Sequence, residues 1–142
     1  MGWARRSFPP QYLMMVLTQS CNKTNNIDLL AGYWEISSVS LEGNELKNYP
    51  FSNTVDYFEF DEKNSGFRKK VKPKMDGNFN ITMHQIDFKL LISNGRKIIE
   101  YGKGDNFKEE IIKLDSLNLF IENNEGYIYK YKRFTPKNYL DG

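Results

Sequence analysis

Cysteine and histidine, which often serve as nucleophiles, bases or metal ligands, occur once each in this sequence, as Cys21 and His84. A histidine-based metal cluster, or a catalytic Cys-His site chosen from several candidates, therefore cannot be built. His84 is expected to be a polar residue at a strand end. Asp56, Glu59 and Asp61 fall on different faces of one short segment and are expected to be solvated. No glycine-rich phosphate loop occurs, so the sequence predicts neither an enzyme nor a metal or cofactor site.

The segment 67–74 (FRKKVKPK) is strongly basic. Strand periodicity gives one of its faces four cations, namely Arg68, Lys70, Lys72 and Lys74. This face predicts either a solvated surface that discourages aggregation or a patch for anionic headgroups. Lys69 has the opposite phase, between Phe67 and Val71, which would carry it toward the interior. There it would need a carboxylate, water or an anionic ligand headgroup, unless a bulge or strand end lets it reach solvent.

Residues 1–20 have the order of an export signal. Arg5 and Arg6 are positive, residues 12–17 are apolar, and the segment 17–21 (LTQSC) resembles a relaxed bacterial lipobox, in which the cysteine becomes lipidated and N-terminal. Residues 21–27 then form an expected polar tether. The apolar run is short, so a disordered tail with an incidental free thiol is the alternative.

The composition fits one folded domain. The chain has 142 residues, of which 39% are hydrophobic, and its aromatic residues are 10 Phe, 9 Tyr and 2 Trp. Lys and Arg number 20 and Asp and Glu 18, and this near-balance gives no electrostatic case for nucleic-acid binding.

Between residues 28 and 134, short apolar–polar alternations are separated by turn signals such as Asn94 and Gly95. We predict an all-β fold, an up-and-down antiparallel β-barrel of about eight strands, followed by a tail at residues 135–142. A helical turn is expected at 26–31 and a β-bulge near Ser37 and Ser38. The long connection 42–54 carries apolar residues that are expected to plug the open end or to cover a ligand.

The segment 30–36 (LAGYWEI) resembles the Gly-x-Trp opening of the first strand of lipocalins. Together with 57–66 (YFEFDEKNSG), 126–133 (GYIYKYKR), the lipobox and the tether, it makes the chain similar to bacterial lipocalin-like lipoproteins of a kind common in Bacteroidota. This resemblance implies that Gly32 lets the chain turn closely at the barrel floor and that Trp34 closes the floor. It also implies that Arg133, or Lys132, packs across the indole.

The resemblance further implies a lipocalin-like barrel in the bacterial cell envelope, attached to the outer membrane through Cys21, that holds a small apolar or amphipathic molecule. The expected ligand-binding side chains face one interior, and they are Phe58, Phe60, Lys69, Phe79, Ile81, Met83, Phe88, Tyr127, Tyr129 and Tyr131. The three tyrosines could equally be ordinary barrel core. Because the body is short for a lipocalin, the alternative is a filled barrel that engages another protein, for example as an inhibitor, through its rim or basic face.

The lipobox generates the first prediction. Intact mass measurement of membrane-extracted protein should find a mature chain that begins at an acylated Cys21, because more than one acyl chain makes anchoring stable. A Cys21→Ser variant should lose both the acyl mass and the membrane fraction. A soluble, unmodified full-length wild-type chain would contradict the lipoprotein interpretation.

Overall fold

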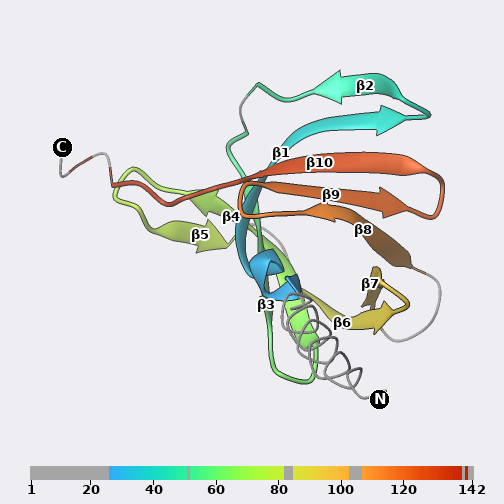
Figure 1. Ribbon diagram of the computed structural model, residues 1–142. Coiled ribbons are helices and arrows are strands. Elements are labelled where there is room, and N and C mark those ends of the chain that lie inside the picture. The colour runs from blue at the N-terminus through green and yellow to red at the C-terminus, as the bar shows by residue number, and fades with distance from the viewer. Residues whose placement is uncertain (1–25, 51, 82–84, 103–106, 139, 141–142) are drawn as a thin grey trace, which may run out of the picture.

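The regular secondary structure of the described chain consists almost entirely of β-strands (Figure 1). The computed structural model describes residues 26–50, 52–81, 85–102, 107–138 and 140. Within these residues, the 3-10 helix η2 (Ile27–Leu30) occupies the place of the expected helical turn. The strands are β1 (Gly32–Leu41), β2 (Asn44–Asn48), β3 (Val55–Phe60), β4 (Ser65–Pro73), β5 (Phe79–Ile81), β6 (Ile86–Ser93), β7 (Arg96–Tyr101), β8 (Lys108–Leu114), β9 (Asn118–Asn123) and β10 (Tyr127–Arg133).

Eight strands close into an antiparallel barrel, which confirms the predicted fold class. The ring runs β1-β3-β4-β6-β7-β8-β9-β10, and β10 pairs back with β1. Closure pairs the ring strands on both sides, so the ring itself has no open edge. The two other strands lie off the ring, since β2 pairs only with β1 and β5 only with β4 (Figure 1).

Local sequence signals predicted two irregular features correctly. The register between β1 and β10 shifts between Ile36 and Ser38, which confirms the expected β-bulge. Before this bulge β1 pairs with β3, and after it with β2, as expected where a bulge bends a strand. Asn94 and Gly95 have φ angles of 52° and 79° and form the tight turn between β6 and β7.

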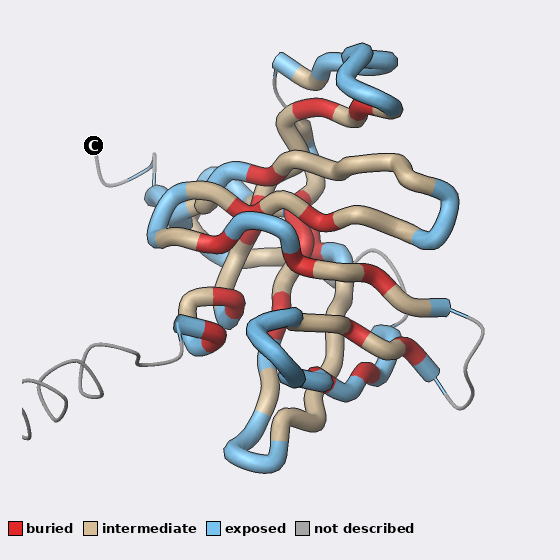
Figure 2. The backbone as a smooth tube through the Cα atoms, turned by 45° about the vertical axis from the view of Figure 1, so that its right-hand side comes forward, coloured by how far each residue is buried: buried red, intermediate tan, exposed pale blue. Residues whose placement is uncertain are grey.

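The structure departs from two other expectations. Within the described residues of the connection 42–54, strand β2 forms in place of the expected plug or lid, and its five residues are all exposed (Figure 2). Leu46 in particular is 55% exposed. Phe79, Ile81 and Met83 were expected to line the barrel, but β5 pairs only with the end of β4, from Val71 to Pro73, and Met83 lies outside the described residues. Strands β2 and β5 are short appendages to barrel strands.

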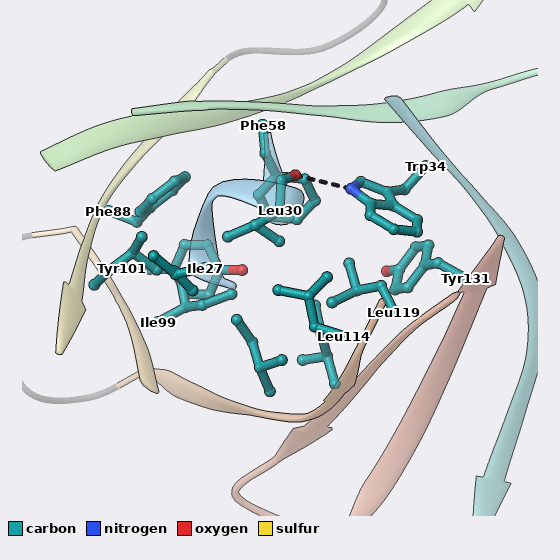
Figure 3. Close-up of a cluster of buried hydrophobic side chains, with 13 residues drawn as sticks. Ile27, Leu30, Trp34, Phe58, Phe88, Ile99, Tyr101, Leu114, Leu119 and Tyr131 are labelled. Atoms are coloured by element: carbon teal, nitrogen blue, oxygen red, sulfur yellow. Dashed lines mark hydrogen bonds between the residues drawn. The ribbon is translucent and has the colours of Figure 1, made fainter. Parts of the chain in front are cut away.

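The core fills the end of the barrel that η2 covers (Figure 3). Leu30 of η2, Trp34 of β1 and Phe58 of β3 are completely buried there. The indole Nε1 of Trp34 donates a hydrogen bond to the Leu30 carbonyl oxygen at 2.8 Å, so its polar atom is satisfied in the interior. This end of the barrel is therefore a packed floor.

Arg133 packs against the floor and links it to η2. Its guanidinium carbon lies 3.9 Å from the centroid of the Trp34 ring. Its nitrogens donate to the carbonyl oxygens of Leu29 and Ala31, at the end of η2. Gly32 has a φ of +115°, and a Cβ at this position would lie 2.8 Å from Arg133 Nη1, so glycine is needed for both backbone angle and space. The structure thus brings together the three floor residues that the resemblance implied.

The expectations for the N-terminal segment lie outside the described residues. They concern the export signal at 1–20, Cys21, and all of the tether except Asn26 and Ile27. Across the part of the chain that the structure describes, no helix has the length and apolar character needed to span a bilayer.

Replacing Trp34 with alanine should lower the free energy of unfolding by about 3–5 kcal/mol, because it empties a large buried aromatic site. Urea denaturation measures this loss. The matched control is Leu46→Ala on the exposed β2, which should change the same quantity by less than about 0.5 kcal/mol. A loss below about 1 kcal/mol for Trp34→Ala would mean that the floor does not depend on the indole.

Candidate functional site

The interior of the barrel contains a charged cluster centred on Arg68. Arg68 of β4 is paired in register with Phe58 of β3, and Phe58 is fully buried. Directly paired residues share a face of the sheet, so Arg68 also points inward. Its guanidinium carbon lies 4.8 Å from the centroid of the Phe58 ring. The cluster therefore rests on the apolar core.

All five N–H groups of Arg68 have partners inside the barrel. Nε and Nη2 donate to Oδ2 of Asp56 at 3.1 and 2.5 Å, and Nη2 also donates to the Tyr131 hydroxyl at 2.8 Å. Nη1 donates to the Tyr101 hydroxyl at 2.5 Å and to Oε1 of Glu109 at 3.1 Å. Since guanidinium has five donors, the capacity of Arg68 for hydrogen bonds is used in full.

The cluster contains two carboxylates and two cations, so its formal charge is zero. Asp56 and Glu109 are only 3% and 7% exposed, and Lys70 Nζ lies 2.8 Å from Oδ1 of Asp56. The Tyr101 hydroxyl donates to Oε1 of Glu109 at 2.6 Å. Buried ions are tolerated only when they are paired and hydrogen-bonded in this way.

The pKa values follow this pairing. Burial favours the neutral form of Asp56, but the positive charges of Arg68 and Lys70 outweigh it and hold the Asp56 pKa below its usual value. Burial raises the pKa of the Tyr101 hydroxyl well above its usual value, against the lowering effect of Arg68. Burial raises the pKa of the Tyr131 hydroxyl in the same way. At neutral pH both phenols are therefore protonated.

An open cavity of about 490 Å³ lies against this cluster. Its lining combines the charged cluster with aromatic and aliphatic side chains, which include Arg68, Lys70, Ile86, Tyr101, Phe107, Glu109, Tyr129 and Tyr131. A volume of this size suits a small ligand, because ligand pockets usually have about 300–1,000 Å³. The barrel is thus packed at the floor and hollow at the other end, with the charged cluster between the two.

Several expected binding residues belong to the packed half instead. Phe58 and Phe88 are core residues, and Phe60 packs against them while half-buried. Tyr131 joins the charged cluster, Tyr129 lines the cavity, and Tyr127 lies beyond Tyr129 on the same face of β10. The side chain of Ile81 and the whole of Met83 lie outside what the structure describes, as does His84.

Strand phase was expected to carry Lys69 inward unless a bulge or strand end let it reach solvent, but Lys69 pairs with Tyr57 on the outer face of the barrel without either. Although Lys69 borders the cavity, its ammonium lies outside the barrel wall, 5.6 Å from the Tyr57 ring centroid and 5.4 Å from that of Phe67. Phe79 lies on the same outer face, stacked on Tyr33 with ring centroids 4.4 Å apart. The apolar residues Phe67 and Val71 suggested that their face of β4 is the inner one. They lie on the outer face, which β5 partly covers.

Five residues of the charged cluster were given other roles or missed. Asp56 was expected to be solvated, and Arg68 and Lys70 were assigned to a solvated or headgroup-binding surface. Tyr101 and Glu109 were not singled out. The signal that could have found them is strand phase, since Asp56 alternates with Phe58 and Phe60, and Glu109 with Ile111. Among the described residues, no group of three or more His, Cys, Asp and Glu side chains could hold a metal ion.

Replacing Arg68 with methionine should lower the free energy of unfolding by about 3–5 kcal/mol, the usual cost of breaking a buried ion pair. The variant leaves Glu109 without its cation and Asp56 with Lys70 alone. Arg96→Met is the control, because the Arg96 side chain is 63% exposed and its bridge to Glu110 is a surface pair, worth less than about 1 kcal/mol. Thermal and urea denaturation measure both. Similar small losses in the two variants would contradict the structural role of Arg68.

A model of the lipocalin-like domain family matches residues 30–121. The fold is also similar to the crystal structure of a lipocalin-like protein from Bacteroides uniformis, with a TM-score of 0.45 and 14% sequence identity, over 75% of this chain and 99% of that chain. No curated protein matches the chain. Because the family model spans more than half of the sequence, the chain belongs to the lipocalin-like domain family.

Proposed function

We propose that this protein binds a small apolar or amphipathic molecule in the open half of its barrel. The observation that carries the proposal is the cavity of about 490 Å³. Its aromatic and aliphatic walls, with a few polar groups at one end, match the usual make-up of ligand sites. A lipocalin-like barrel fits such a role.

The proposal includes attachment to the bacterial cell envelope as an outer-membrane lipoprotein. Its support is the order of the N-terminal residues, with Arg5 and Arg6 before an apolar run and Cys21 at its end. Acylation of Cys21 would hold the barrel close to a membrane, from which an amphipathic molecule can partition.

The alternative function, a filled barrel that acts on a protein partner, has less support. The barrel has an open cavity, and the basic face on which that alternative partly depended is divided, because Arg68 and Lys70 point inward. A pull-down with the intact protein tests whether a protein partner binds through the rim.

A variant that fills the cavity tests the proposal. Ile86 lines the cavity, so Ile86→Trp should weaken binding of the neutral fluorescent probe N-phenyl-1-naphthylamine by about tenfold or more, a loss of about 1.4 kcal/mol. Leu91→Trp is the matched control, since Leu91 is 37% exposed on the same strand and pairs with Ile98 on the outer face. Its affinity should equal that of wild type in a fluorescence titration.

The proposal fails if wild type shows no saturable binding. It also fails if the two tryptophan variants bind equally well, because the probe would then be bound outside the cavity.

A further inference from the structure

Glu109 offers the cavity an acceptor that the protein does not use. Its side chain is 7% exposed and lines the cavity. Both hydrogen bonds that it receives, from Arg68 and from Tyr101, end on Oε1. No donor from a described residue reaches Oε2, and a buried carboxylate oxygen without a donor is unfavourable.

Tyr131 offers a donor at the same end of the cavity. Its hydroxyl oxygen accepts a hydrogen bond from Arg68, but within the described residues its own proton has no acceptor. Tyr131 is 6% exposed and also lines the cavity. Burial raises its pKa, so the hydroxyl stays protonated at neutral pH and can donate.

The cluster is poorly suited to an anionic headgroup. The five donors of Arg68 are occupied by protein groups, and the Lys70 ammonium is paired with Asp56. Two carboxylates balance these two cations, and the ammonium of Lys69, which also borders the cavity, lies outside the barrel wall. A ligand carboxylate placed here would meet Glu109 at close range, and like charges repel strongly in a desolvated site.

We infer that the cavity selects an amphipathic alcohol, whose hydroxyl head donates to Glu109 Oε2 and accepts from Tyr131. This inference rests on the proposed function and names its ligand class. A hydroxyl suits the site because it is both donor and acceptor and is uncharged. The aliphatic chain of the ligand would lie against the walls that Ile86, Phe107 and Tyr129 form.

Isothermal titration calorimetry of the intact protein with three probes tests the inference. Decan-1-ol has the required head, its methyl ether can only accept a hydrogen bond, and decanoic acid is ionised at neutral pH. In wild type, decan-1-ol should bind at least about tenfold more tightly than either of the others, about the worth of one buried hydrogen bond. This comparison needs no variant.

The variant Glu109→Gln provides a second test of the inference with the same three probes. The glutamine amide can donate into the cavity and leaves one cation unbalanced, so the ether and the acid should each gain about tenfold relative to the alcohol. The control is Glu110→Gln, the adjacent residue, whose side chain lies outside the barrel and pairs with Arg96. It should leave the wild-type order of affinities unchanged.

The outcomes separate this inference from the proposed function. If wild type binds decanoic acid as tightly as decan-1-ol, or tighter, the inference is overturned and binding in the cavity stands. An ether that binds as well as the alcohol overturns it too, because no donor would then be needed. If neither the three probes nor N-phenyl-1-naphthylamine bind, both the inference and the proposed function are contradicted.

Discussion

The ion and hydrogen-bond cluster around Arg68 is the interaction on which the rest of this structure depends. It joins five strands of the barrel, through Asp56 of β3, Arg68 of β4, Tyr101 of β7, Glu109 of β8 and Tyr131 of β10. A largely buried guanidinium, such as that of Arg68 with a side chain 16% exposed, is stable only if its partners are held in place. The cluster therefore fixes the cross-section of the barrel where packed core gives way to open cavity.

The two ends of the barrel follow from this division. At the floor, Trp34, η2 and Arg133 close the barrel, and Gly32 allows their close approach. At the other end, the apolar core stops at the charged cluster, and the cavity lies beside it. The groups of this cluster therefore form the polar end of the cavity.

The sequence predicted the fold better than the site. Strand periodicity, the turn at Asn94 and the bulge after Ile36 are local signals, and each predicted its feature correctly. The phase of β4 was misjudged because charge was taken to mean solvent exposure. Arg68 is largely buried only because Asp56 on the neighbouring strand β3 and Glu109 on β8, which is 41 residues away in the sequence, pair with it. Such compensation depends on tertiary contacts that periodicity alone does not contain.

A crystal structure of the protein with decan-1-ol bound would test most directly whether the Arg68 cluster forms the recognition end of a ligand cavity. We expect the alcohol inside the barrel, with its hydroxyl within hydrogen-bond distance of Glu109 and its chain along Tyr129 and Phe107. The contacts of Arg68 should be unchanged. An alcohol bound on the outer face beside Tyr33 and Phe79, or one that displaces Asp56 or Glu109 from Arg68, would contradict it.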